Sequence, residues 1–401
     1  MKILQVSHRV PYPLNEGGTI GIYNYTRGFF EAGHEVTLVT LNGIKHQIDL
    51  DDARYELDKY CKMYVFNINT NVQPIPALIS LLKGSSYNVS RFYSFDFERF
   101  LSSLLTSTTF DIIQVEGTFV AMYLKVIRAH SSAPVILRQH NVEYQIWERL
   151  ALNEPNRLKK WYLNVLSKRL KAFEQKILNQ FDAIVPVTDD DAQLFKNLGG
   201  HKPYFVSPAG IDTNYWEAAR SIGNPHYIYH LGSLEWIPNR EAVLWFINEI
   251  WPSIYKIDKR FKLFIAGKGM PDFMKQMHID GVEMVGEVED AATFIKDKSI
   301  VVVPLQSGSG IRLKILEAMA AEKLVISTSI GAQGIPVENG KELLIANDLK
   351  SFIELFTEIS SNENSFNNVR KNGYDLIQNS YSNQAVISRL IGFYNTLIKA
   401  N

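Results

Sequence analysis

Several features are scarce in this chain, and each absence excludes a class of protein. A single cysteine, Cys61, excludes an intrachain disulfide framework and fits a reducing compartment. Met1 and Lys2 lead straight into a strand-like segment without the apolar core of a signal peptide, and no apolar run approaches the roughly 20 residues of a membrane span. Lys+Arg and Asp+Glu are both 42, so net charge gives no reason to expect nucleic acid. We therefore expect a cytoplasmic protein that at most touches a membrane from the side.

The length and the patterning predict two α/β domains. At 401 residues the chain exceeds what one hydrophobic core usually serves. Residues 3–6 and 35–40 read as buried strands, joined by a helix for which Thr19 is the expected N-cap, and together they make a βαβ unit. The second half repeats this alternation, with a domain crossing at residues 207–212.

One stretch in the second half, residues 301–321, predicts an anion site. Three valines fill a buried strand, and the following Ser-Gly-Ser-Gly loop leaves little side chain to obstruct a ligand. From Ile311 the periodicity becomes helical. A strand, a small-residue loop and a helix start bind anions well, because free backbone N–H groups and the helix dipole point into the loop.

Two cations at the start of this helix, Arg312 and Lys314, fit the same reading. A cation there opposes the helix dipole, and a bound anion would reverse the sign of that interaction. The alternative is that Lys314 pairs with Glu317 on a solvated helix face while Arg312 points into water. Taken alone, the stretch leaves both readings open.

Glycine or serine follows each of the other strands of the second half. Such turns lie at the carboxyl edge of a parallel sheet, where ligands bind in α/β proteins, and here they include Ser233, Gly267 and the Gly286-Glu287 pair. In the first half, Glu116 and His140 directly follow or end strands and are candidates to face a cleft. A histidine satisfied within its own loop is the alternative for His140.

Two other segments have both a structural and a functional reading. The aromatic residues between positions 87 and 100 are typical of a core, with an acceptor wall or a membrane surface as the less favoured reading. Residues 157–178 form an amphipathic basic helix, which is usually a solvated face and in a minority of cases docks on an anionic membrane.

The chain resembles the family 4 glycosyltransferases, which are retaining, nucleotide-sugar-dependent enzymes. The resemblance is carried by PYPLNEGG and GHEVTLVT in the first half, SPAGIDTNYW at the crossing, and most specifically VPLQSGSGIRLKILEAMAAEKLVISTSIGAQGI. It implies the α/β GT-B fold, in which two Rossmann-like domains with doubly wound parallel sheets face each other across a cleft. We accordingly expect an acceptor-side domain over 1–207, a donor-binding domain over 208–380, and a final helix over 381–401 that packs back on the first domain.

The resemblance also implies roles for individual residues. Glu317 matches the glutamate that accepts hydrogen bonds from the donor ribose, whereas Ser309 stands where the family places a second glutamate on the donor sugar. His140 matches a histidine that contacts that sugar. The family's diphosphate-binding arginine and lysine fall at Ser233 and near Pro238, so Arg312 and Lys314 are the expected replacements. The remaining donor-side candidates are Gly17, Gly18, Gly267, Glu287, Gly310 and Ile311, and Glu116 is an acceptor-side candidate.

The expected reaction is transfer of a hexosyl unit from a nucleoside diphosphate sugar to the hydroxyl of a saccharide or lipid-linked saccharide, in bacterial polysaccharide or glycoconjugate synthesis. Amides of a helix start with Arg312 and Lys314 would stabilise the leaving diphosphate. No D-x-D motif stands in a loop beside the expected donor site, and Asp189, Asp190 and Asp191 read as a helix start, so we expect neither a metal nor another cofactor. A nucleotide-sugar 2-epimerase of the same fold and a non-catalytic nucleotide-sugar-binding protein are the alternatives.

Overall fold

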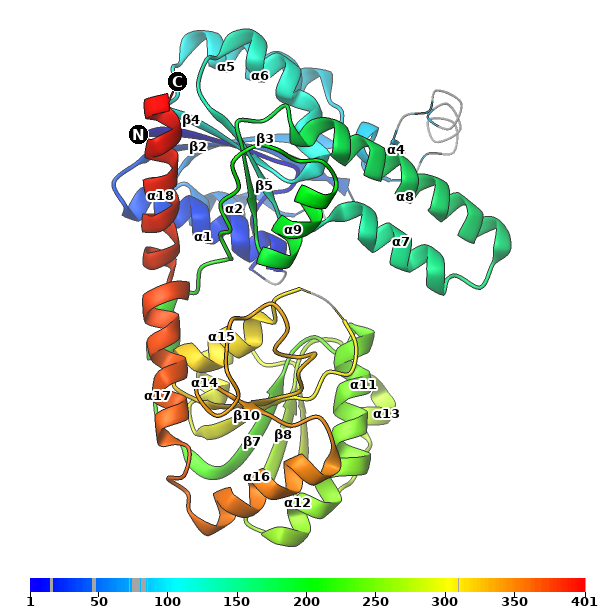
Figure 1. Cartoon of the computed structure of the whole chain (residues 1–401), viewed down its shortest axis with the longest axis vertical. Coiled ribbons are helices and arrows are strands. Elements are labelled where there is room, and N and C mark those ends of the chain that lie inside the picture. The colour runs from blue at the N-terminus through cyan, green and yellow to red at the C-terminus, as the bar shows by residue number, and fades with distance from the viewer. Residues whose placement is uncertain are drawn as a thin grey trace. The chain divides into compact units, whose positions relative to one another are not determined.

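The computed structural model describes residues 1–14, 17–44, 48–71, 73, 80, 84, 86–308 and 310–400. The chain divides into two compact units, Met1–Gly210 with Val386–Asn401, and Ile211–Ala385 (Figure 1). The sequence places the domain change between residues 207 and 208, and the units divide at Gly210. The chain returns to the first unit inside its last helix.

The first unit is built on a parallel sheet in the order β3-β2-β1-β4-β5-β6. Successive side chains alternate between the two faces: Ile3 packs in the core on one face and Leu4 in the core on the other, so the strand is buried on both sides. The chain order reverses between β1 and β4, which makes that point the switch point of the sheet. The strands are β1 (Lys2–Ser7), β2 (Glu35–Gly43), β3 (Lys62–Ile68), β4 (Ile112–Glu116), β5 (Val135–Gln139) and β6 (Ala183–Pro186).

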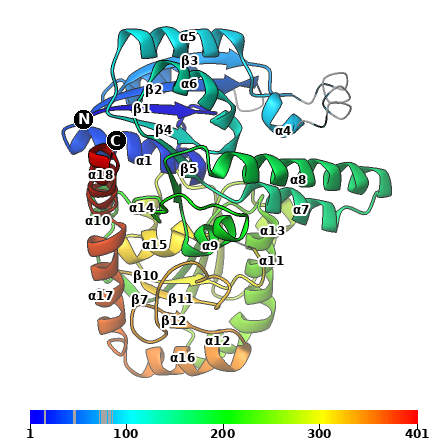
Figure 2. The same cartoon turned by 45° about the horizontal axis from the view of Figure 1, so that its top comes forward.

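Helices cover both faces of this sheet (Figures 1 and 2). One core contains residues of α1, α2 and the C-terminal helix α18, and the other contains residues of α5, α6, α8 and α9. The helices are α1 (Gly17–Glu31), α2 (Leu50–Leu57), α4 (Tyr87–Ser90), α5 (Phe95–Ser107), the 3-10 helix η2 (Thr118–Tyr123), α6 (Leu124–His130), α7 (Glu143–Asn153), α8 (Arg157–Leu178), α9 (Asp189–Asn197) and α18 (Asn383–Ala400).

The second unit has the same topology around its own switch point, with the parallel order β12-β11-β10-β7-β8-β9. Val302 packs on one face of β10 while Val301 and Val303 pack on the other, as expected for a strand buried on both sides. The switch point lies between β7 and β10. The strands are β7 (Asn224–Leu231), β8 (Lys262–Ala266), β9 (Val282–Gly286), β10 (Lys298–Val303), β11 (Leu324–Ser327) and β12 (Leu344–Ile345).

Helices again lie on both faces. Residues of α11, α12 and α16 share one core with the sheet, and residues of α10, α14 and α15 share the other. The helices of this unit are α10 (Thr213–Glu217), α11 (Ile237–Trp245), the π-helix η3 (Phe246–Ile250), α12 (Trp251–Ile257), α13 (Asp272–Lys275), α14 (Ala291–Ile295), α15 (Leu313–Ala320), α16 (Leu349–Ser361), α17 (Asn367–Leu376) and the π-helix η4 (Ile377–Tyr381). Within the described part of the chain, no helix is long and apolar enough to cross a membrane.

The structure decides two predictions about where helices begin. The prediction that Thr19 caps the first helix is wrong, because α1 already begins at Gly17 and the Thr19 side chain is buried inside the unit. The prediction that the three aspartates begin a helix is confirmed. Thr188 is the N-cap of α9, and its side chain accepts a hydrogen bond from the backbone N–H of Asp191 at 3.0 Å.

Candidate functional site

The loop between β10 and α15 leads the chain to the carboxyl edge of the second sheet. Gly308 and Gly310 have φ values of 115° and 86°, which favour glycine. The chain then enters α15 with Arg312 as the N-cap, so Ile311 and Arg312 precede the helix instead of forming its first turn. Ser309, where the family resemblance places a glutamate, lies outside the described residues.

Arg312 is held under this loop. Its guanidinium donates to the carbonyl of Gly310 and lies over the ring of Trp236, at 5.4 Å from Cζ to the ring centroid. The residue is 5% exposed, so it does not point into water as the alternative reading required. A Cβ at Gly308 would lie 2.9 Å from the guanidinium, which shows how closely the loop covers it. Burial lowers the pKa of Arg312 from its ordinary value.

Lys314 lies at the switch point of the second sheet, where it bonds two polar side chains. Its Nζ donates to Asn239 Oδ1 at 2.9 Å and contacts His230 Nε2 at 3.3 Å. His230 Nδ1 lies 3.0 Å from the Val302 carbonyl, which can only accept, so Nδ1 carries the proton and Nε2 accepts from Lys314. The pKa of Lys314 is lowered to about 7, chiefly by burial; the charge of Glu317 opposes this change, and the nearby charge of Arg312 adds a smaller lowering.

Glu317 lies one turn further along α15 and is half-buried. No hydrogen bond or ion pair to its carboxylate is made among the residues that the structure describes, so the pair with Lys314 that the alternative reading required is absent there. Burial raises the pKa of Glu317 to about 7, and the charge of Lys314 only partly opposes this. The helix therefore presents a carboxylate for which the described residues of its unit supply no donor.

The other strand ends of this unit pack tightly around the lysine. A Cβ at Gly232 would lie 2.3 Å from Lys314 Nζ, and one at Gly267 would lie 1.8 Å from the carbonyl oxygen of Gly232. Close approach of the backbone therefore requires glycine at position 267, whereas a side chain at position 232 would have to displace the flexible end of Lys314. Ser233 is exposed, and its backbone carbonyl accepts from Asn239 Nδ2 at 2.8 Å, so Ser233 positions the partner of Lys314.

Glu287 follows β9 at the edge of the sheet and is exposed. No contact among the described residues joins it to Lys314 or Arg312. The structure thus brings Arg312, Lys314 and Glu317 together on one loop and helix start, supported by Gly232, Ser233 and Gly267, while Glu287 stays apart from them.

The first unit has a buried polar network at its own switch point. Glu116, at the end of β4, is 0% exposed, and its Oε2 lies 3.0 Å from Arg138 NH1 and 2.8 Å from His140 Nε2. The other oxygen accepts from Gln5 and Gln114. Burial alone raises the pKa of Glu116, but the Arg138 charge and the hydrogen bonds from His140 and Gln114 outweigh it and hold the pKa at about 2.

His140 is oriented by this carboxylate. Burial and the charge of Arg138 lower the pKa of His140, and the hydrogen bond to Glu116 opposes them. The ring is therefore neutral at pH 7, and the ionised Glu116 fixes the proton on Nε2, which leaves Nδ1 as an acceptor. His8 lies on the other side of the strand end and contacts the Glu116 carbonyl at 3.1 Å through Nδ1.

Gly17 and Gly18 form the first turn of α1, so they are not part of the preceding loop. A Cβ at Gly18 would lie 3.7 Å from Arg9 NH1, an ordinary contact, so packing does not require glycine there. Gly21, one turn later, is more constrained, because a Cβ would lie 3.3 Å from Arg138 NH2.

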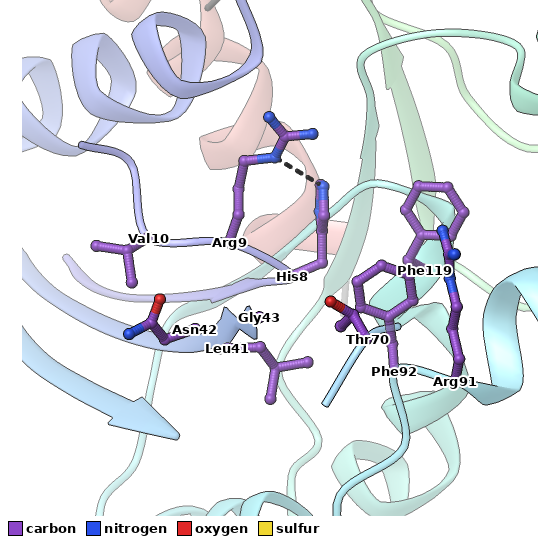
Figure 3. A pocket seen from close by; sticks show the side chains of 10 residues that line it. All are labelled: His8, Arg9, Val10, Leu41, Asn42, Gly43, Thr70, Arg91, Phe92 and Phe119. Atoms are coloured by element: carbon purple, nitrogen blue, oxygen red, sulfur yellow. Dashed lines mark hydrogen bonds between the residues drawn. The ribbon is translucent and has the colours of Figure 1, made fainter. Parts of the chain in front are cut away.

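A pocket of about 120 Å³ opens at the carboxyl edge of the first sheet (Figure 3). Phe92 and Phe119 stack in it with ring centroids 4.9 Å apart, and His8 lies edge-on to both rings. Arg91 adds a positive charge to the lining, and its guanidinium lies beside Phe119 in Figure 3. Burial lowers the pKa of Arg91 from its ordinary value. The lining residues are His8, Arg9, Val10, Leu41, Asn42, Gly43, Thr70, Arg91, Phe92 and Phe119.

Comparison with protein families identifies the chain. Residues 16–215 match the model "Glycosyltransferase Family 4", and residues 225–362 match "Glycosyl transferases group 1". The chain belongs to glycosyltransferase family 4. This family 4 glycosyltransferase is 25% identical to an uncharacterized 44.6 kDa protein in the cps region of Klebsiella pneumoniae, over 97% of this chain and 98% of that protein. An uncharacterized glycosyltransferase of Methanocaldococcus jannaschii is 32% identical over 30% of this chain and 36% of its own length.

Solved structures share the whole architecture of the enzyme. The crystal structure of Anabaena HepE in complex with UDP has a TM-score of 0.68 at 11% identity, covering 99% of this chain and 100% of that one. Sucrose-phosphate synthase from Thermosynechococcus elongatus has a TM-score of 0.68 at 15% identity and covers 100% of both chains. These likenesses confirm the predicted α/β GT-B fold.

Three residues that hold the predicted site side chains in place are not among those predicted from the sequence: Arg138, His230 and Asn239. Arg138 and His230 did leave a signal, because each is a polar residue that follows an apolar run near the end of its strand, VIL in β5 and YIY in β7. A buried polar side chain needs a partner, and each of the two lies just before a predicted site loop. Asn239 left no comparable signal, since an asparagine near a helix start is ordinary.

Proposed function

We propose that this glycosyltransferase moves a hexosyl unit with retention from a nucleoside diphosphate sugar to a hydroxyl of a saccharide or lipid-linked saccharide, in polysaccharide synthesis at the inner face of a membrane. One observation carries the donor assignment. Lys314 and Glu317 lie one turn apart at the switch point of the second sheet, each desolvated, and neither neutralises the other. A ligand with a diphosphate and ribose hydroxyls would satisfy both groups.

In the reaction, the bond from the anomeric carbon to the diphosphate oxygen breaks and the acceptor oxygen bonds the same carbon. The acceptor proton leaves with the nucleoside diphosphate. Negative charge grows on the phosphate oxygens as they depart, and Arg312 and Lys314, already poorly solvated, would interact with it more strongly than cations in water. We propose that these cations make a metal unnecessary, so turnover should persist in excess EDTA.

The other residues have supporting roles in this proposal. Glu317 accepts hydrogen bonds from the ribose, as the family resemblance implies. His140, fixed by Glu116, offers Nδ1 as the acceptor for a hydroxyl of the transferred sugar. The aromatic pocket beside His8 and Phe119 would take the acceptor saccharide, because sugar rings pack their apolar faces on aromatic side chains.

Similar proteins support the substrate class. HepE has been crystallised with UDP and with UDP-glucose, and TarM from S. aureus with UDP and a sugar glycerol compound. The relative in the cps region of Klebsiella pneumoniae supports a role in polysaccharide synthesis.

The test is incubation of the purified enzyme with UDP-, GDP- and ADP-sugars. A transferase releases free nucleoside diphosphate, slowly to water and faster when an acceptor is present. A 2-epimerase would instead change the configuration of the donor sugar, and a binding protein would raise the melting temperature without releasing nucleotide. Binding without release, under conditions that include an extract of polysaccharide precursors, would contradict the proposal.

A further inference from the structure

Helices α7 and α8 form an antiparallel hairpin that extends beyond the sheet of the first unit (Figures 1 and 2). Its root is fixed inside the unit. Glu174, which is 0% exposed, accepts hydrogen bonds from the backbone N–H groups of Glu143 and Tyr144 at 3.1 Å each. This carboxylate caps the start of α7 from α8, so the two helices enter the unit as one element.

The apolar side of α8 is divided between two environments. Toward the root, Leu170, Ile177 and Leu178 are buried in the core, which is the ordinary fate of an amphipathic stripe. At the far end four large apolar side chains around the turn are exposed, and we call them the hairpin tip: Leu150 (51%), Leu152 (66%), Leu158 (81%) and Trp161 (61%).

Such a cluster needs an explanation that single exposed leucines do not need. Among the residues that the structure describes, none covers these four side chains, and the turn that joins the two helices points away from the sheet (Figure 2). None of the four residues is part of the donor site on α15 or of the pocket beside His8.

The charges around the tip indicate what covers it. Helix α8 carries seven basic residues and one acidic residue, and that acid is the buried Glu174 at the root. Arg149 and Arg157 are exposed beside the tip, and Lys159, also exposed, forms an ion pair with Glu154 in the turn at 2.5 Å. An interface with another protein is typically depleted of lysine, whereas a bilayer with anionic headgroups attracts an apolar surface flanked by cations. Tryptophan in particular favours the boundary between headgroups and acyl chains.

We infer that the hairpin tip inserts into the headgroup region of an anionic lipid bilayer, with the basic side chains of α8 held against its surface. The biological reason rests on the proposed function, because a lipid-linked acceptor is presented at such a surface. The contact itself requires no catalysis. The basic helix predicted from sequence docks through its exposed first turns and the neighbouring end of α7, and not along its length.

The experiment is co-sedimentation of the full-length protein with vesicles of phosphatidylcholine alone and with vesicles in which about a third of the lipid is phosphatidylglycerol. We expect binding to the anionic vesicles only. The Leu158→Ser/Trp161→Ser variant should bind at least about tenfold more weakly. Tyr55→Ser/Phe273→Ser, two side chains of similar exposure elsewhere (79% and 55%), is the matched control and should bind as wild type.

Charge is tested separately. Arg149→Gln/Arg157→Gln should weaken binding by about fivefold per charge and flatten its salt dependence, since each cation near an anionic surface contributes independently. The Trp161 fluorescence, taken as the difference between wild type and Trp161→Phe, should shift to shorter wavelength on anionic vesicles.

Three results would overturn the inference: no binding of the wild type to either vesicle, unchanged binding of the tip variant, or loss in that variant of a concentration-dependent dimer with no change in vesicle binding. Nucleotide release to water without lipid should be the same in wild type and tip variant. A failure of that release in both would count against the proposed function and leave the membrane contact standing.

Discussion

The two sheets share one topology, but the polar groups at their switch points are satisfied to different degrees by the protein itself. At β1 and β4, Glu116 is enclosed by an arginine, a histidine and two glutamines, and its pKa is held at about 2. At β7 and β10, Lys314 and Glu317 are desolvated, and their pKa values both lie near 7.

The difference separates two uses of the same position in a fold. A buried ion pair whose partners are all present holds its surroundings in one arrangement, and removing one member leaves a buried charge. A desolvated lysine that bonds only neutral groups, and a desolvated carboxylate to which no described residue donates, weaken the free protein and gain most when a ligand supplies a counter-charge and donors. The first switch point therefore maintains structure around His140, and the desolvated groups at the second support our proposal that it receives a ligand.

The largest expected effect is on stability, in Glu116→Ala. The substitution leaves Arg138 buried without a counter-charge, which should lower the free energy of unfolding of the first unit by about 3–5 kcal/mol. Urea denaturation measures it, with the exposed Glu287→Ala as control, for which a change within about 0.5 kcal/mol is expected. A loss below about 1 kcal/mol for Glu116→Ala would mean that the network is not structural.

The matching change at the second switch point, Lys314→Met, should reverse the pattern. Removing a desolvated cation should leave the melting temperature of the ligand-free protein unchanged or higher, while kcat falls about 10²–10³-fold, as when one transition-state donor is lost. Lys275→Met, on the exposed helix α13, is the control for both measurements. If Lys314→Met unfolded the protein and left the turnover of folded molecules intact, the comparison between the units would fail.

Glu317→Gln should act on binding. The amide retains an oxygen but loses the charge, so donor affinity should fall by about 10- to 150-fold, the equivalent of 1.5–3 kcal/mol. Calorimetric titration with UDP and with the donor measures this. Equal affinities in wild type and variant would remove Glu317 from the ribose site.

The smallest effect is a pH dependence. A bound diphosphate should raise the pKa of Lys314 above its free value of about 7, so the complex holds more protons than the free enzyme between the two pKa values. Affinity for UDP should therefore fall as the pH rises above 7, by at most about tenfold per pH unit. At pH 8, titrations in two buffers with different ionisation heats should report proton uptake, and Lys314→Met should abolish it. Uptake that persists in the variant would assign the proton to another group.

The sequence was informative where local pattern and local structure coincide. Three consecutive valines and the Ser-Gly-Ser-Gly loop predict β10 and its turn, because burial and freedom of φ are local properties. The sequence pattern predicts that α15 begins at Ile311. The backbone of Arg312 is still extended, with ψ at 91°, because that residue forms the cap after Gly310.

Contacts between distant residues could not be predicted in this way. Arg138 gives a local signal of burial but not of its partner, since Glu116 lies on a neighbouring strand. The network also includes Tyr394, which donates to Gln114 across most of the length of the chain. No periodicity reports such a pair. For Lys314 and Glu317 a local pattern points to a contact that the structure does not make. Their spacing along the helix predicts a pair, but the lysine turns toward His230 and Asn239.

The return of α18 to the first unit has a consequence for biosynthesis. Leu390 and Tyr394 lie in the same core as Ile3 and Phe29, although the whole second unit is translated between them. While the ribosome makes residues 211–385, the first unit has the α1 and α2 side chains of this core but lacks those of α18. The core of the first unit can therefore be completed only after the whole second unit has been translated.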